Sequence, residues 1–414
     1  MIPASYRPLL ALVVAAIASS AFAADDPIRE KALKLNQTTG TSAMASRLSE
    51  LLKDEAGTKK LLETAAKMVK DEKPNPLNYT ACFILAKAAQ IQKNPNAALV
   101  FYKACATDAT KLGSAQKIID VFNGMVGLYM VTKKYDEAIQ ACQEFLDIQI
   151  EDVENPINQE KPFMMEKLIL ATGRKGKLDD AIKLTENLIE KDKGGWYFVR
   201  VKAEVFRDNE KYSDAADAYL ETIERLKKSK RLEDEARDAY IRHMRYTLSG
   251  VYVDMKDIDK GAEQLQILLK DDPENATFMN DLGFIWADND LKIEESEKLI
   301  RKAIAKDREQ RKKIEDLPKD EDVDNPAYLD SLGWVLFKKK EYKEAKQHLT
   351  TAIKLEGGKN IEIFDHLADV HMALGEKAEA IKVWKESLKI EDSTKRDTER
   401  RKKVEQKLAA AEKK

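Results

Sequence analysis

The chain has 414 residues, and its 71 basic and 73 acidic side chains leave a formal net charge of only −2. This balance argues against a nucleic-acid-binding protein, because phosphate binding needs a concentrated positive surface. Charged residues make up 35% and aromatic residues 7% of the sequence, a composition typical of long amphipathic helices.

The first 23 residues are predicted to be a secretory signal peptide. Arg7 supplies a positive charge, and residues 9–18 form an apolar run too short to span a bilayer. A small–large–small cleavage motif at 21–23 predicts a mature chain that begins at Ala24, with an uncleaved membrane anchor as the alternative. No cysteine directly follows the apolar run, and no later apolar stretch is long enough to cross a membrane. We therefore expect an exported protein, periplasmic or secreted, without a lipid anchor or membrane insertion.

The segment after the signal peptide is weakly patterned. Residues 24–41 show little periodicity and are expected to form a flexible lead-in. Residues 42–78 are amphipathic and are expected to form a degenerate pair of helices.

From residue 79 to residue 390, small and apolar residues recur at fixed spacings, most clearly in 326–357. Leu332 and Gly333 lie in the first predicted helix of that segment. Ala345, Leu349 and Ala352 follow in the second helix, on one stripe. Gly333 and Ala345 are small because a side chain at either position would separate the two helices. Eight such copies can be counted, several of them 34 residues apart.

A 34-residue repeat with these residues resembles the tetratricopeptide repeat family, and the resemblance covers about three quarters of the chain. It implies an all-α fold, a right-handed superhelical solenoid of about eight to nine helix pairs that binds proteins. Repeats are expected at 79–307 and 326–390, with a charged extension and loop at 308–325. Residues 391–414 are expected to form a charged helix that caps the last repeat.

The last third also resembles exported bacterial tetratricopeptide proteins, in the runs 325–334 and 365–370. Some members of that group act as adaptors for periplasmic proteases. This chain lacks their lipid-bearing cysteine, so neither anchoring nor the protease role is carried over to it.

The family resemblance also implies where a ligand binds, because the first helix of each pair lines the concave inner face. Aromatic and hydrogen-bonding residues interleaved there are typical of protein-recognition surfaces. Trp334 and Phe337 are the best anchor candidates, and packing against the adjacent repeat is the alternative for each. The residues expected on this face are Tyr197, Arg200, Glu204, Arg207, His243, Tyr246, Asn280, Phe284, Asp288, Asp330, Trp334, Phe337, Glu362, Asp365 and Asp369.

The predicted partner is a protein or peptide. The basic clamp with which some tetratricopeptide modules hold chaperone carboxylates is not matched in any adjoining pair of repeats. The inner face is acidic near the C-terminus instead, which favours a basic or neutral partner. Binding that strengthens with rising salt would count against that interpretation.

No catalytic, metal or cofactor site is predicted. His366 and His371 are five residues apart and do not share a helix face. Asp365 and Asp369 do share one, and with His366 they could hold a cation or act in catalysis, but solvated groove residues are the favoured interpretation. The sequence has no glycine-rich phosphate loop and no nucleophile elbow.

The three cysteines and one basic stretch leave further alternatives. The cysteines occupy interior repeat positions, which favours buried thiols over one disulfide and one free thiol: Cys82, Cys105 and Cys142. The basic stretch 400–403 could favour a membrane surface, but acidic neighbours favour a solvated capping helix.

The sequence therefore favours a non-catalytic extracytoplasmic scaffold or adaptor. The first alternative is a regulatory subunit of an exported hydrolase or protease. A component of cell-envelope assembly or surface-polysaccharide machinery is less favoured, and a catalyst least.

Overall fold

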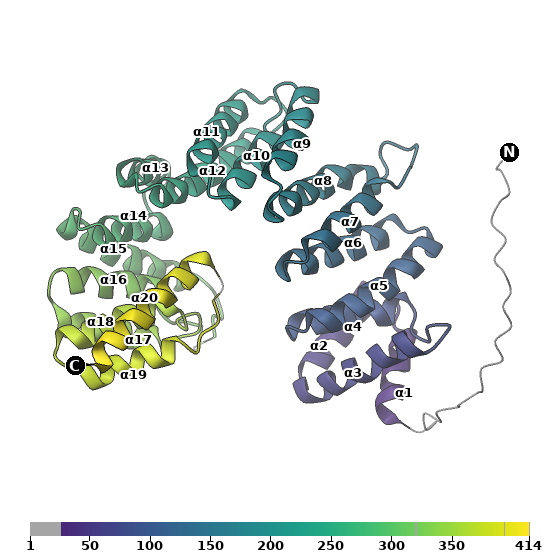
Figure 1. The fold of residues 1–414 in the computed structure, drawn as a ribbon, viewed down its shortest axis with the longest axis horizontal. Helices are drawn as coiled ribbons and strands as arrows, with labels where there is room; N and C mark the ends of the chain where they lie inside the picture. The colour runs from purple at the N-terminus through teal and green to yellow at the C-terminus, as the bar shows by residue number, and fades with distance from the viewer. Residues whose placement is uncertain (1–25, 319–320, 393, 414) are drawn as a thin grey trace. The chain divides into compact units, whose positions relative to one another are not determined.

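The computed structural model describes residues 26–318, 321–392 and 394–413, and every regular element in these ranges is a helix (Figure 1). The predicted all-α class is confirmed. The predicted signal peptide lies outside the described residues. Within the described ranges, none of the helices combines the length and the apolar character that crossing a bilayer requires.

The chain divides into two compact units, residues 1–175 and 176–414. In the first unit, α4 packs on α5, and α6 packs on α7. Its helices are α1 Pro27–Lys34, the 3-10 helix η1 Leu35–Gln37, α2 Thr41–Leu52, α3 Glu55–Asp71, α4 Tyr79–Ile91, α5 Pro95–Leu112, α6 Ala115–Val131, α7 Tyr135–Leu146 and α8 Pro156–Arg174.

The expectation of a flexible lead-in at 24–41 is wrong for residues 27–37, which are helical. Asp26 caps α1 by accepting a hydrogen bond from the Ile28 amide, and a proline occupies the first turn of the helix. The helix is held because Ala32 is fully buried and because Arg29 forms a two-pronged ion pair with Glu72, the residue directly after α3.

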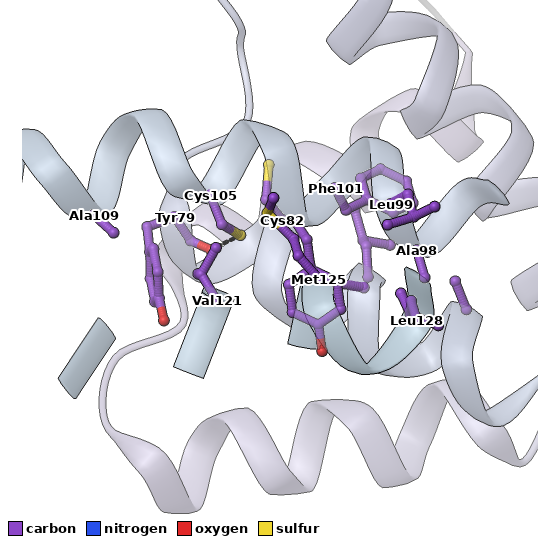
Figure 2. Close-up of a cluster of buried hydrophobic side chains, with 14 of the residues drawn as sticks. Tyr79, Cys82, Ala98, Leu99, Phe101, Cys105, Ala109, Val121, Met125 and Leu128 are labelled. Atoms are coloured by element: carbon purple, nitrogen blue, oxygen red, sulfur yellow. Dashed lines mark hydrogen bonds between the residues drawn. The ribbon is translucent and has the colours of Figure 1, made fainter. Parts of the chain in front are cut away.

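The core of the first unit contains large aromatic side chains and all three cysteines. Figure 2 shows the part of it around Cys82 and Cys105. Phe101 and Tyr102 of α5 are fully buried. The Cys105 thiol donates to the carbonyl of Tyr79 across the α4–α5 interface, with S···O 3.6 Å. All three cysteines are buried and free, as predicted.

In the second unit, too, consecutive helices pack in pairs. Its consecutive pairs are α10 with α11, α12 with α13, α14 with α15, α16 with α17 and α18 with α19. The bounds are α9 Leu178–Lys191, α10 Tyr197–Asp208, α11 Tyr212–Lys228, α12 Asp234–Asp254, α13 Ile258–Asp271, α14 Ala276–Asp288, α15 Ile293–Arg311, α16 Pro326–Lys338, α17 Tyr342–Ala352, α18 Ile361–Ala373, α19 Lys377–Ser387 and α20 Lys395–Glu412.

The small residues predicted from the repeat lie where the two helices of a pair approach most closely. A Cβ atom on Gly333 would lie 2.5 Å from Cγ of Leu349, and one on Gly283 would lie 2.6 Å from Cγ1 of Ile300. Ala345 is fully buried on the partner helix of Gly333. Close approach of the two backbones therefore depends on the missing side chains.

The connection within a pair is short because the first helix is followed by a residue in the left-handed conformation, which ends the helix and turns the chain. This signal was missed in the sequence because lysine is the commonest residue there. The residues with positive φ at these turns are Lys93, Lys133, Glu210, Lys256, Asp290, Lys340 and Gly375.

Candidate functional site

The residues predicted for the inner face lie on α10, α12, α14, α16 and α18, the first helices of successive pairs in the second unit. We call the surface that they form with their neighbours on these five helices the inner face. On α10, Arg200 forms an ion pair with Glu204 at 2.6 Å, and its guanidinium lies 4.8 Å from the ring centroid of Tyr197. These three residues therefore form a connected group on α10.

A pocket of about 520 Å³ opens on the inner face. Its walls come from α10, α12, α13 and α14, and one residue of α20 completes them. Four predicted inner-face residues line it: Arg207, His243, Tyr246 and Phe284. Residues that the sequence did not predict also line it, among them Asp254, Leu265, Asp281, Ile285 and Arg396.

Tyr246 is the central aromatic residue of the pocket. Its hydroxyl donates to Oδ2 of Asp281 at 2.6 Å, and its ring lies 5.6 Å from that of Phe278. Burial raises the pKa of Asp281 above its ordinary value, although the hydrogen bond from Tyr246 opposes the shift. The Tyr246 side chain is nevertheless 37% exposed. An oriented aromatic ring with one open side is suited to contact an apolar or aromatic group.

Trp334 and Phe337 stack on each other, with ring centroids 5.0 Å apart and an interplanar angle of 7°. Trp334 also stacks on His366 at 4.1 Å and donates from Nε1 to Asp288 at 3.0 Å. Both rings are half-buried. The structure thus shows the internal packing that was the alternative for these residues, and their role as anchors stays a prediction.

Three predicted inner-face residues are buried, so the expectation that they are exposed is wrong. Asn280 is 4% exposed, and its amide donates to Asp281. Asp330 is hydrogen-bonded to Nδ1 of His366 at 2.9 Å, and that imidazole is itself fully buried. Asp365 is the third. The buried carboxylates of Asp330 and Asp365 are stable in such positions because each has hydrogen-bond partners.

Asp365 connects three helices. It accepts hydrogen bonds from Nε1 of Trp384 in α19 at 3.0 Å, from Lys407 in α20 at 2.8 Å and from Arg400 in α20 at 3.2 Å. Burial alone would raise the pKa of this carboxyl, but Lys407, Trp384 and Arg400 together hold it below its ordinary value. Asp365 is therefore a charged group inside the protein with partners on every side.

Asp369, one turn further along α18, shares Lys407 with Asp365, at 2.6 Å. Burial and the neighbouring Asp365 carboxylate raise the pKa of Asp369. The acidic end of the inner face is therefore present as predicted, but its charges are already paired within the chain.

The helix that supplies these cations is α20, which was predicted as a terminal cap and not as part of the inner face. Arg400 also forms an ion pair with Glu362 of α18. At the N-terminal end of α20, Arg396 donates to Asp254 of α12 at 2.5 Å, and Lys395 pairs with Glu210 before α11. Because its partners include both α18 and α12, α20 lies across the inner face.

The basic stretch at 400–403 is divided between two environments. Arg400 contacts Asp365 on the inner face. Arg401 instead donates to the carbonyl of Leu388 at 2.8 Å and to Asp392 at 2.9 Å. Only Lys402 and Lys403 are exposed. This leaves two of the four cations directed at solvent.

The described part of the chain contains no group of three or more His, Cys, Asp or Glu side chains arranged to hold a metal ion. The candidates for catalysis are held by other side chains of the chain. Lys407 pairs with both Asp365 and Asp369, and Asp330 is hydrogen-bonded to His366.

Comparison with known proteins identifies the repeats. Residues 167–229 and 327–358 match family models of the tetratricopeptide repeat. A TPR repeat-containing protein of Pseudomonas aeruginosa is 27% identical over 109 residues, which cover 26% of this chain and 16% of that relative. The chain therefore matches less than a fifth of the relative's length.

Two solved structures align with this chain at low identity. A tetratricopeptide repeat protein from Parabacteroides merdae aligns with a TM-score of 0.44 and 11% identity, covering 69% of this chain and 98% of that one. A chain from the crystal structure of the APC/C hetero-tetramer Cut9–Hcn1 aligns with a TM-score of 0.41 and 16% identity, covering 91% of this chain and 66% of that one.

Proposed function

Because the chain carries tetratricopeptide repeats, we propose that it is a non-catalytic, exported scaffold that binds a segment of a partner protein on the inner face of residues 176–414. The observation that carries this proposal is the pocket of about 520 Å³ at Tyr246 and Phe284. Its volume falls in the range of pockets that hold side chains and small ligands.

The pocket suits a partner segment that inserts one apolar or aromatic side chain. Phe284, Ile285 and Leu265 supply apolar walls, and the Tyr246 ring is fixed by its hydrogen bond to Asp281. Arg207 in the pocket wall offers N–H donors for the backbone carbonyls of the partner. Aromatic and arginine residues that become buried on binding carry most of the energy in protein–protein interfaces.

The exported location rests on the signal peptide predicted at 1–23. Sequencing the N-terminus of the protein purified from its native host tests it directly, and we expect the mature chain to begin at Ala24. A chain that retains Met1 would contradict export by this route.

Partner binding is tested by cross-linked capture from the native cell envelope with the full-length protein. We expect Tyr246→Ala/Phe284→Ala to lose the captured partner. Leu220→Ala/Ile314→Ala is the matched control, since both residues are exposed, apolar and outside the pocket. Recovery of the same partners by both variants would overturn the pocket assignment.

A parallel Trp334→Ala/Phe337→Ala variant tests the anchors predicted from the sequence. If the captured partner is a hydrolase or protease, its activity with and without the bound chain separates a regulatory subunit from a passive adaptor.

A further inference from the structure

The contacts of α20 recur with helical periodicity. Its contacts with α12, α18 and α19 include those of Arg396, Arg400, Val404, Lys407 and Ala411, at intervals of three or four that place these residues on one stripe. Val404 and Ala411 are buried against α18 and α19, and the three cations pair with inner-face carboxylates. This is how an amphipathic helix binds in a groove, except that both parts belong to one chain.

The acidic residues under α20 specify the charge of whatever covers them. Asp365 is fully buried and ionised, and Glu362 and Asp369 lie on the same face of the helix. A buried carboxylate without a cation is strongly unfavourable, so a segment that replaces α20 must supply positive charge at the positions of Arg400 and Lys407. The Trp384 indole N–H donates one hydrogen bond to the Asp365 carboxylate. The other hydrogen-bonding positions of its two oxygens are left for cations.

The attachment of α20 is local and partly exposed. Only Val404 and Ala411 are buried along its 18 residues. The side chains of Lys395 and Arg396, which make the contacts furthest from α18, are 56% and 67% exposed, so these ion pairs contribute little. Arg401 holds the connection to α19 through the carbonyls of Leu388 and Ile390, separately from the inner face.

We propose that the acidic surface of α18, formed by Glu362, Asp365 and Asp369, is a docking site for a basic amphipathic helix of the partner, and that α20 occupies this site until the partner helix replaces it. The inference rests on the proposed function, because it names the chemistry of the segment that the scaffold binds. Since Arg396 forms part of the pocket wall, release of α20 also widens the pocket at Tyr246.

The test uses the full chain and a fluorescent peptide with the sequence of residues 394–413. Arg400→Glu/Lys407→Glu places like charges against the acidic surface and releases α20. We expect this variant to bind the peptide at least tenfold more tightly than the wild-type chain, in which α20 competes. Fluorescence anisotropy measures both affinities, and rising salt should weaken binding to the variant because its ion pairs become screened.

Lys402→Glu/Lys403→Glu is the matched control, because it makes the same change of charge on the exposed face of the same helix. This control should bind the peptide as weakly as the wild-type chain. A peptide that itself carries Arg400→Glu/Lys407→Glu should not bind to any form of the chain.

Equal affinity of the charge-reversed variant and the wild-type chain would overturn the proposal. If circular dichroism shows that this variant does not fold, Arg401→Ala decides, because it loosens the α19–α20 connection without changing the inner-face charges. We expect that variant to bind the peptide at least threefold more tightly than the wild-type chain, and no increase would overturn the proposal.

The outcomes separate the two proposals. Peptide binding without capture of any envelope protein would support the docking site and contradict the scaffold function. Capture that depends on Tyr246 and Phe284, without peptide binding, would support the scaffold and overturn the docking site.

Discussion

Replacing Gly333 with alanine should destabilise residues 176–414, although alanine is the better helix former. The new Cβ atom of α16 would lie 2.5 Å from Cγ and 2.9 Å from Cδ2 of Leu349 in α17. Either Leu349 leaves its rotamer or the two helices move apart. Overpacking of this kind costs about 1–3 kcal/mol, against about 1 kcal/mol gained by removing glycine from a helix interior. We therefore expect a net loss of about 0–2 kcal/mol in the free energy of unfolding.

Gly250 provides the matched control, because it lies inside α12 of the same unit and a Cβ atom there meets nothing within 4 Å. Gly250→Ala keeps the gain in helix propensity without the clash, so it should stabilise by about 0.5–1 kcal/mol. In a Leu349→Ala background, Gly333→Ala should no longer destabilise, because Cγ and both Cδ atoms of Leu349 have been removed.

Tryptophan fluorescence during urea denaturation measures these effects in the second unit alone. All four tryptophans of the chain lie between residues 176 and 414: Trp196, Trp286, Trp334 and Trp384. Equal shifts of the unfolding midpoint in the same direction for Gly333→Ala and Gly250→Ala would show that contact with Leu349 does not restrict residue 333.

Three further outcomes follow from burial. Ala345→Glu should lose about 3–5 kcal/mol of unfolding free energy, since the charge enters the α16–α17 contact unpaired, and an unchanged urea midpoint would contradict the repeat frame. Cys82, Cys105 and Cys142 are all fully buried, so a thiol reagent should label no cysteine in the folded chain and three after unfolding. Burial raises the pKa of Cys142 to about 12 and also raises that of Cys105, whereas a hydrogen bond with Cys105 lowers the pKa of Cys82. A count of one after unfolding would reveal a disulfide. Burial alone would lower the pKa of His366, but Asp330 outweighs it and the pKa is raised. The protonated imidazole stabilises the fold fully below the unfolded-state pKa of about 6.5, and this stabilisation is lost as pH rises through the higher pKa of the folded state. Denaturation midpoints should therefore fall as pH rises through this range. The fall should be smaller in Asp330→Asn.

The parts of the fold that the sequence predicts are those set by local spacing. Gly333, Ala345 and Leu349 form a pattern within one helix pair, and this pattern needs no knowledge of the rest of the chain. The buried cysteines follow from the same spacing. Four of the residues that line the pocket were placed on the inner face by their position in the repeat: Arg207, His243, Tyr246 and Phe284.

Two elements depend on contacts that spacing does not show. The first helix, α1, buries only Ala32, which is too little for a periodic signal, although Asp26 and Pro27 carry a readable helix start. The position of α20 depends on pairs such as Arg396 with Asp254, which are 142 residues apart in the sequence. Repeat periodicity predicted the helix but gave no information about the surface on which it lies.

The contact between α20 and α18 changes how salt dependence must be interpreted. Salt screens the ion pairs of α20 and those of a basic partner alike, so the affinity measured on the wild-type chain reports the difference between the two sets. A partner that makes more ion pairs than α20 binds more weakly as salt rises, whereas one that makes fewer binds more tightly even though the site is acidic. Strengthening with salt therefore does not by itself exclude a basic partner. The Arg400→Glu/Lys407→Glu variant removes the internal competitor, and in that background only a fall in affinity with salt is consistent with an acidic docking surface.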